Sequence, residues 1–196
     1  MAMTIGIFLG SFNPIHYGHL MVLRYWLNET SLSAIWLMVS PQNPHKSLEA
    51  LAPECDRLQM VRLAIAGEAR LYASDIEFFL PRPSYTIQTL RYLQAHYPTY
   101  EWRILIGADA FATIPTWKEG NTLLSEYTFW IYPRQGSTPA YLPERSVFFS
   151  QAPRIDLSAT QIRNYLKNRQ SIRFLVPSEV ENYIYEHGLY GTAKAT

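Results

Sequence analysis

Two histidines lie three residues apart at the point where a strand-like run passes into a helical pattern. His16 and His19 follow the apolar residues 4–9 and open a helical pattern over 18–29. The first amides of a helix are free and its dipole is positive there, so anions bind at such places. Both rings share one face of the first turn, and each can donate a hydrogen bond to a phosphate oxygen. The spacing therefore indicates phosphate chemistry on a nucleotide.

Two other interpretations of the histidine pair remain open. The rings could pack against the core, or they could form part of a zinc site at helical spacing. A zinc site needs further ligands, and Cys55 is the only cysteine of the chain. Gly18, between the two histidines, is expected to let a ligand approach the backbone closely.

Strand-like and helical segments alternate along the chain. Several of the strand-like runs are apolar throughout, as in a parallel sheet that is covered on both faces. The alternation predicts an α/β fold with a Rossmann-like open parallel sheet, helices on both faces and a small helical part at the C-terminus. The strands are expected at 4–9, 34–39, 71–73, 102–106, 127–131 and 146–149, and the helices at 18–29, 53–67, 84–97, 118–125, 159–168 and 178–187.

Residues suited to ligand binding gather where predicted strands end. In an open α/β sheet, ligands bind beyond the carboxyl ends of the strands. Four segments are therefore expected to converge at one edge of the sheet: 10–19, 40–46, 107–109 and 157–163.

The last of these segments has the pattern of a capped helix. Ser158 and Gln161 form a capping box, so the helix is expected to begin near Ser158. Ser158 and Thr160 offer hydroxyl groups, and the first-turn amides are free to bind an anion. Arg163 leans back toward the start of the helix and can grip the same anion with two hydrogen bonds. An ordinary capped helix with an exposed arginine is the alternative.

Two further segments offer a charge at the same edge. Lys46 follows Pro41 and Pro44 in a restricted loop, and it is either a phosphate contact or a solvated lysine. Asp109 follows an apolar strand, where an aspartate can accept hydrogen bonds from both hydroxyls of a ribose. A helix N-cap is the equally weighted alternative for Asp109.

The stretch from Gly10 to Leu20 resembles the HxGH signature of the nucleotidyltransferase superfamily. Its longer form, GSFxPIHxGHL, narrows the resemblance to adenylyltransferases of cofactor synthesis. Residues 157–163 resemble the ISxTxIR motif of the same enzymes, with Leu157 in place of isoleucine. Asn13 stands where many bacterial members have aspartate, which makes an acidic or metal-binding role at this position doubtful.

Three other stretches are similar to those of nicotinate-mononucleotide adenylyltransferases. Asn43 to Lys46 matches a loop that contacts ligand phosphate in that family. Residues 84–90 resemble its SYTxDTL segment, with Gln88 in place of aspartate, and Trp117 matches a tryptophan that stacks on the pyridine ring. Arg134 matches a further family position. The resemblance covers about residues 4–190 and implies one nucleotidyltransferase domain over 1–196.

The resemblance implies the transfer of AMP from ATP to nicotinate mononucleotide, with deamido-NAD and pyrophosphate as products. It implies that Mg²⁺ arrives with ATP and that the protein has no dedicated metal ligands. Residues assigned to catalysis are His16, His19, Lys46 and Arg163. Those assigned to ATP are Gly10, Ser11, Phe12, His16, His19, Gly107, Asp109, Ser158, Thr160 and Arg163, and those assigned to the mononucleotide are Asn43, Lys46, Ser84, Tyr85, Thr86, Trp117 and Arg134.

Alternative acceptors are nicotinamide mononucleotide and phosphopantetheine, and a non-catalytic nucleotide-binding module is an alternative of another class. The hydrophobic fraction of 48% and charged fraction of 17% are those of a folded protein. A net charge of +1 gives no reason to expect a nucleic-acid partner. No apolar run is long enough to span a membrane, and no signal peptide is evident. A cytoplasmic location and possible homo-oligomers are expected.

Overall fold

The computed structural model describes residues 3–42 and 51–193. Its centre is a six-stranded sheet in the order β3-β2-β1-β4-β5-β6, and every neighbouring pair of strands is parallel. The chain moves outward from β1 to β3, returns to β4 beside β1, and then moves outward on the other side. The strand order therefore reverses between β1 and β4, which is where ligands bind in doubly wound sheets. The strands are β1 (Met3–Gly10), β2 (Ala34–Val39), β3 (Leu71–Ser74), β4 (Tyr100–Gly107), β5 (Phe129–Tyr132) and β6 (Ser146–Phe148).

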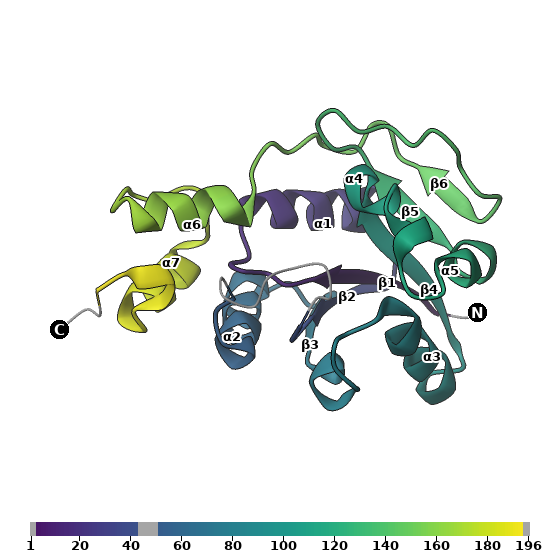
Figure 1. The fold of residues 1–196 in the computed structure, drawn as a ribbon, viewed down its shortest axis with the longest axis horizontal. Coiled ribbons are helices and arrows are strands. Elements are labelled where there is room, and N and C mark those ends of the chain that lie inside the picture. Colours follow the sequence, from purple (N-terminus) through teal and green to yellow (C-terminus); the bar gives the residue numbers. More distant parts are fainter. Residues whose placement is uncertain (1–2, 43–50, 194–196) are drawn as a thin grey trace.

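Helices connect these strands and follow the last of them (Figure 1). The α-helices of the described residues are α1 (Tyr17–Glu29), α2 (Glu54–Ile65), α3 (Thr86–His96), α4 (Ala108–Phe111), α5 (Gly120–Glu126), α6 (Ala159–Lys167) and α7 (Ser178–Glu186). Short 3₁₀ turns are η2 (Ile76–Phe79), η3 (Ile114–Thr116) and η4 (Leu189–Gly191).

Apolar side chains on the two faces of the sheet build two cores. In β1, Ile5 and Ile7 belong to the core that includes α3, α4 and α5, whereas Phe8 belongs to the core that includes α1 and α2. In β2, Leu37 belongs to the core that includes α1 and α2, and Met38 belongs to the core that includes α3, α4 and α5. Alternate side chains of a strand point to opposite faces, so covering both faces requires the apolar runs seen in the sequence.

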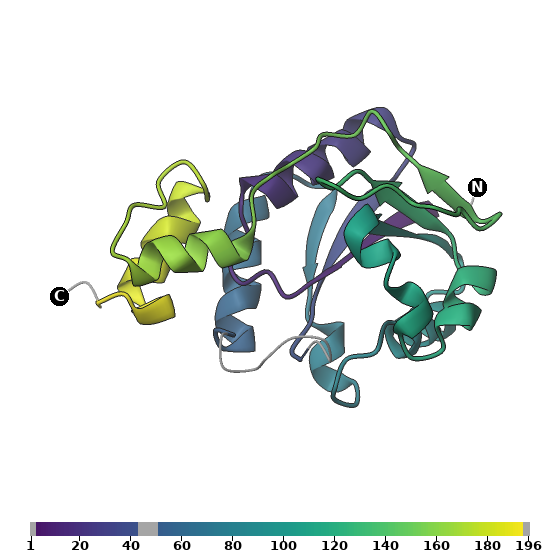
Figure 2. The ribbon, with the colours of Figure 1, turned by 45° about the horizontal axis from the view of Figure 1, so that its top comes forward.

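The C-terminal helices form a group at one end of the molecule. Figures 1 and 2 both show α6 and α7 together at the end away from α3 and α5. Both helices join the core of α1 and α2 through buried residues, among them Ile162 and Val180. The hydroxyl of Tyr183 in α7 donates a hydrogen bond to Asp56 in α2 at 2.8 Å. The segment between β6 and α6 passes over α1, with Ile155 against Gly18.

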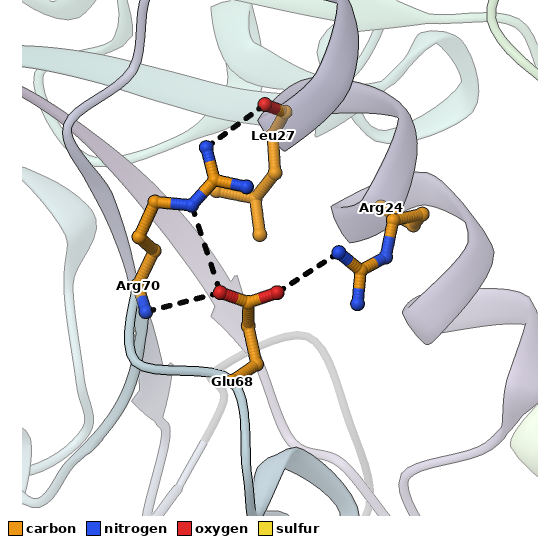
Figure 3. A network of polar contacts seen from close by, with 4 residues as sticks. All are labelled: Arg24, Leu27, Glu68 and Arg70. Atoms are coloured by element: carbon orange, nitrogen blue, oxygen red, sulfur yellow. Dashed lines mark hydrogen bonds and ion pairs between the residues drawn. The ribbon is translucent and has the colours of Figure 1, made fainter.

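The edge of the sheet opposite the carboxyl ends contains a small polar network (Figure 3). Glu68 accepts hydrogen bonds from Arg24 in α1, at 2.9 Å, and from the backbone N–H of Arg70, at 3.3 Å. The guanidinium of Arg70 donates to the carbonyl of Leu27 at 3.1 Å. Leu27 lies in the last turn of α1, where carbonyls lack helical partners, so Arg70 satisfies one of them.

The predicted fold class is confirmed, and most predicted segments agree with the observed elements to within about two residues. Three differences are found. Residues 108–111 form α4, for which the sequence pattern predicted no helix. Ser84 and Tyr85 precede α3 instead of lying inside it, and Pro53 is the N-cap of α2 instead of a first-turn residue. No helix within the described residues is long and apolar enough to cross a lipid bilayer.

Candidate active site

His16 and His19 stack at the start of α1. Their ring centroids are 3.7 Å apart, and the backbone N–H of His16 donates to Nδ1 of His19 at 3.3 Å. Because Nδ1 of His19 accepts a hydrogen bond, a neutral His19 carries its proton on Nε2. Phe8 and Phe12 pack edge-on against the His19 ring, with centroids 6.0 and 5.3 Å away. The His19 ring is therefore held between aromatic side chains, and in its neutral form its N–H donor is Nε2.

His16 occupies a different environment from its neighbour. It is 4% exposed, and its buried Nδ1 has no hydrogen-bond partner among the described residues. Burial, followed by the nearby positive charge of Arg134, lowers the pKa of His16 from 6.5 to about 4. Burial therefore favours the neutral imidazole form of His16 near pH 7. His16 can still exchange hydrogen bonds as a neutral group.

Two glycines of this segment make room for side chains of the protein itself. A Cβ on Gly18 would lie 2.7 Å from Ile155 Cγ2 and 2.9 Å from His16 Nδ1. A Cβ on Gly10 would lie 2.8 Å from the ring of Phe12. The expectation that Gly18 admits a ligand to the backbone is therefore wrong, because the His16 ring and Ile155 fill that space.

Asn13 connects the histidine segment to two distant parts of the chain. Its side-chain Oδ1 accepts from the backbone N–H of Ala52 at 3.0 Å and from the Tyr190 hydroxyl at 2.9 Å. Its backbone carbonyl accepts from Arg163 at 2.8 Å. Asn13 is 4% exposed. An oxygen that already accepts two protein hydrogen bonds is poorly suited to bind a metal ion, so position 13 has a structural role in this chain.

Arg163 lies beside the histidine segment, although 150 residues separate it from Asn13. Its guanidinium also contacts the Thr160 hydroxyl at 3.3 Å, so the side chain leans back toward the start of α6 as predicted. Ser158 caps α6: its Oγ accepts from the Gln161 N–H at 3.2 Å, and the Gln161 side chain accepts from the Ser158 N–H at 2.9 Å. The predicted capping box is confirmed.

Asp109 forms an ion pair with Arg134, with Oδ2 3.4 Å from Nε. Gly107, and not Asp109, is the N-cap of α4, so the N-cap interpretation of Asp109 is wrong. The Asp109 side chain is 56% exposed and can accept further hydrogen bonds. Arg134 also donates to the carbonyl of Ile155 at 3.0 Å. A Cβ on Gly107 would lie 2.7 Å from Asp109 Oδ1 and 2.9 Å from Arg134 Cγ, so a side chain there would displace this pair.

The start of α3 and the segment around Trp117 lie side by side. Tyr85 is the N-cap of α3, and Lys118 Nζ lies 4.4 Å from the centre of its ring. Arg91 in α3 and Glu119 are joined by two hydrogen bonds, at 3.1 and 2.6 Å. Trp117 is half-buried against the core of α3–α5, and its indole N–H donates to the Thr113 hydroxyl at 2.9 Å. Part of its ring remains exposed.

A buried carboxyl group lies behind the start of α3. Glu77 is 2% exposed and accepts from the Thr89 hydroxyl at 2.8 Å. Burial raises the pKa of Glu77, while the hydroxyls of Thr89, Ser40 and Ser84 act in the opposite direction. The backbone N–H of Ser84 donates to the carbonyl of Gln42 at 2.9 Å. Glu77 therefore lies where the end of β2 meets the segment that leads into α3.

Comparisons with known proteins agree with this arrangement. Residues 7–165 match the cytidylyltransferase-like family model. A probable nicotinate-nucleotide adenylyltransferase of Cytophaga hutchinsonii is 44% identical over 189 residues, which are 96% of this chain and 98% of the relative. A protein of the same description from Synechococcus is 40% identical over 195 residues, covering 95% and 94% of the two chains. The chain belongs to the nicotinate-nucleotide adenylyltransferase family.

Solved structures of this description share the fold. The nicotinic acid mononucleotide adenylyltransferase of Plasmodium falciparum, complexed with NaAD, aligns with a TM-score of 0.83 at 22% identity. The alignment covers 97% of this chain and 98% of that one. The same enzyme complexed with APC gives a TM-score of 0.82 at 21% identity.

The predicted site residues fall into three groups. The histidine group contains Gly10, Ser11, Phe12, His16, His19, Ser158, Thr160 and Arg163, and the Asp109 group contains Gly107, Asp109 and Arg134. Arg134 links these two groups through His16 and Ile155. The third group contains Ser84, Tyr85, Thr86 and Trp117. Asn43 and Lys46 lie outside the described residues.

The contacts place Arg134 differently from the sequence prediction. It was expected to bind the mononucleotide together with Trp117, and the structure shows it paired with Asp109 and donating to the carbonyl of Ile155. Asp109 was expected to bind ATP. Ile155 shortly precedes residues 157–163, a segment that was also expected to bind ATP.

Arg57 is an important residue that the sequence prediction missed. It is 1% exposed and donates hydrogen bonds to four backbone carbonyls around the histidine group. A signal for it existed, because Arg57 occupies the same helical stripe as the buried Val61 and Ile65. A charged residue in an apolar stripe needs buried partners.

Proposed function

We propose that this chain transfers AMP from ATP to nicotinate mononucleotide and releases deamido-NAD and pyrophosphate. Membership of the nicotinate-nucleotide adenylyltransferase family over nearly the whole chain supports this activity. The observation that carries the proposal is the hydrogen bond from Arg163 to the Asn13 carbonyl, which brings α6 to the segment between β1 and α1 that contains the histidines. This segment follows β1, beside which the strand order reverses. Phosphate groups bound there would face donors from both ends of the chain.

The reaction proceeds by direct displacement at the α-phosphorus of ATP. A phosphate oxygen of the mononucleotide forms a new bond to that phosphorus, and the bond to the bridging oxygen of the leaving pyrophosphate breaks. The electron pair of the broken bond leaves with pyrophosphate. The attacking phosphate is already an anion, so no protein base or covalent intermediate is required. Catalysis then consists of positioning and of electrostatic stabilisation.

His19 and Arg163 stabilise the charge that develops during transfer. His19 donates from Nε2, because its Nδ1 accepts a hydrogen bond from the His16 backbone N–H. Arg163 binds phosphate through its planar guanidinium, whose present partners are a carbonyl and a hydroxyl instead of a carboxylate. Neutral His16 orients His19 and contributes hydrogen bonds without net charge.

The remaining groups of residues recognise the two nucleosides. Asp109 binds the ribose hydroxyls of ATP through its exposed carboxylate, and Arg134 holds that carboxylate in place. The opening of α3, at residues 84–86, binds the nicotinate carboxylate, and Trp117 stacks on the pyridine ring. Asn43 and Lys46 contact the mononucleotide phosphate.

Mg²⁺ enters this reaction as part of MgATP. The described residues contain no group of three His, Cys, Asp or Glu side chains that could hold a metal ion. A magnesium ion that keeps phosphate oxygens and water as its ligands fits such a site. Its chemistry when bound is to neutralise phosphate charge.

The direct test is to incubate the purified protein with ATP, Mg²⁺ and nicotinate mononucleotide and to identify the products by mass. The proposal predicts deamido-NAD and pyrophosphate in equal amounts. Binding of ATP without any product would instead identify a non-catalytic nucleotide-binding module. A His19→Ala, Arg163→Ala double variant serves as the control for contaminating activity.

A further inference from the structure

Arg57 in α2 is a buried cation whose described partners are backbone oxygens. Nε donates to the carbonyl of Ala52 at 2.9 Å, and Nη1 donates to those of Ser11 and Ser40, both at 2.7 Å. Nη2 donates to the carbonyl of Pro41 at 3.1 Å. Among the described residues, no carboxylate forms an ion pair with Arg57. A cation taken out of water is costly unless its donors are satisfied, and four carbonyl dipoles satisfy them here.

These carbonyls belong to the segments that surround the proposed phosphate site. Ser11 directly follows β1, and Ser40 and Pro41 directly follow β2. The N–H of Ser40 also donates to the carbonyl of Gly10 at 2.9 Å. The ends of β1 and β2 are therefore joined directly as well as through Arg57. Arg57 therefore fixes the start of the loop between β1 and α1 through its hydrogen bond to the Ser11 carbonyl.

Holding one carbonyl also fixes the direction of one amide. The peptide bond between Ser11 and Phe12 is trans, so its C=O and N–H point in opposite directions. Because the Ser11 carbonyl points at Arg57, the Phe12 N–H points away from it. No described residue accepts a hydrogen bond from this N–H, although Phe12 is 2% exposed. Buried backbone donors without an acceptor are rare, and such a donor is suited to receive a ligand.

The backbone of Phe12 is held in an unusual conformation that supports this reading. Its φ is +45°, in the left-handed region that residues with a side chain seldom adopt. The ring of Phe12 packs against His19, with centroids 5.3 Å apart, so its amide and the His19 donor belong to one rigid unit. Such local strain persists where surrounding contacts determine it, and the hydrogen bond from Arg57 to Ser11 is one of them.

We propose that Arg57 is a positioning residue of the transfer reaction, which aims the Phe12 N–H at a phosphate oxygen of ATP by holding the Ser11 carbonyl. Arg57 itself does not touch the substrate. This inference rests on the proposed function for its reaction, but the contact with ATP can be tested without any acceptor.

The first test is an NMR titration of the unmodified protein, labelled with ¹⁵N at its nine phenylalanines. ATP is added without acceptor, and the amide signals are followed. The proposal predicts that the Phe12 signal shifts downfield and further than the other phenylalanine signals. A Phe12 signal that does not respond to bound ATP would overturn the proposal, and this result requires no variant to fold.

The second test compares Arg57→Lys with Arg70→Lys. Arg70 is the matched control because it also donates to a backbone carbonyl, that of Leu27, but at the opposite edge of the sheet (Figure 3). A lysine at position 57 keeps the charge but loses the planar fork that reaches several carbonyls. We expect kcat for Arg57→Lys to fall about 10–100-fold with a smaller change in KM, since one oriented donor is typically worth about 10²–10³ in rate. Arg70→Lys should keep both constants.

The outcomes separate positioning from stability and from the proposed activity. Arg57→Lys with wild-type kcat and a wild-type Phe12 shift would overturn the positioning role. Loss of the Phe12 shift in a folded Arg57→Lys variant supports that role, even if the wild-type protein uses another acceptor. In that event the failure lies with the proposed substrate and not with Arg57.

Discussion

The backbone N–H of His16 donates to Nδ1 of His19, and this one hydrogen bond gives the two histidines different roles. It places the proton of a neutral His19 ring on Nε2, which is the donor that the proposed mechanism uses. His16 is buried beneath, where the loss of water lowers its pKa to about 4. The pair therefore consists of one donor and one neutral support, although the two residues are identical in the sequence motif.

His19→Ala is expected to lower turnover far more than it weakens ATP binding. A donor aimed at charge that develops in the transition state acts on the chemical step, and loss of one typically costs about 10²–10³ in rate. Turnover is measured by pyrophosphate release and ATP affinity by calorimetry. His96→Ala is the control, since His96 is exposed at the end of α3. A His19→Ala enzyme with near wild-type turnover would refute the mechanism.

His16 should make the free energy of unfolding depend on pH in the acidic range. Its pKa is lower in the folded state, about 4 against 6.5, so the unfolded chain binds the proton more tightly. The stability it contributes is complete above about pH 6.5 and is lost as the pH falls toward 4, by about 3 kcal/mol in total. The measurement compares urea unfolding of the wild type and His16→Asn from pH 4 to 7. If the free energy of unfolding changed with pH in the same way in the two proteins, His16 would not be held neutral in the folded state.

Glu77 should produce the opposite dependence. Burial raises its pKa above the ordinary 4.5, so the folded state binds the proton more tightly than the unfolded chain. This contribution is present below about pH 4.5 and is lost as the pH rises through the raised pKa. Glu77→Gln does not titrate, so it should gain stability relative to the wild type between pH 5 and 8. Thr89→Val removes the hydroxyl partner and serves as the control for lost packing. The assignment would be contradicted if the difference in the free energy of unfolding between Glu77→Gln and the wild type were the same at every pH.

Trp117→Ala is expected to raise KM for the mononucleotide and to leave KM for ATP nearly unchanged. Stacking on the pyridine ring is worth about 0.5–1.5 kcal/mol, which corresponds to roughly a 2–13-fold change. Trp117→Phe should keep most of the effect of the ring. Thr113→Val removes the partner of the indole N–H, together with the bond from the Thr113 hydroxyl to the Ala110 carbonyl, and tests whether orientation of the ring matters. Equal changes in both constants would indicate a general packing role.

The sequence was sufficient to predict the fold and several local features of the candidate site, because both depend on local patterns. Apolar strands, the capping box at Ser158 and the backward lean of Arg163 follow from propensity and helix geometry, and the structure confirms all three. The family motifs then connected segments that are distant in the chain.

The features that sequence missed depend on tertiary contacts. Arg57 is satisfied by carbonyls 17 and 46 residues away, and no local pattern predicts that these oxygens converge. The charge of His16 depends on its burial, and the role of Gly18 depends on Ile155, which arrives from beyond β6. Asn13 was identified as unusual, but its partner Tyr190 lies 177 residues away.

We propose that discrimination between nicotinate and nicotinamide mononucleotide depends on the opening of α3. Backbone N–H groups there can only donate hydrogen bonds, so they suit the oxygens of the nicotinate carboxylate. The NH₂ group of a carboxamide would find no acceptor among them, at a cost of about 1–3 kcal/mol. Lys118, over the Tyr85 ring, is the alternative source of this preference. Lys118→Met keeps the length of the side chain without its charge. If the amides carry the preference, this variant should change the acid-to-amide ratio less than about threefold.

The most direct test of the account is kcat/KM with ATP and Mg²⁺ for three acceptors: nicotinate mononucleotide, nicotinamide mononucleotide and phosphopantetheine. The account predicts that nicotinate mononucleotide is used best, by roughly 5–150-fold over the nicotinamide form, and that phosphopantetheine gives no detectable product. Equal efficiency on the two mononucleotides would show that the carboxylate is not recognised in this way. Preferred use of phosphopantetheine, or no transfer to any of the three, would contradict the proposed function itself.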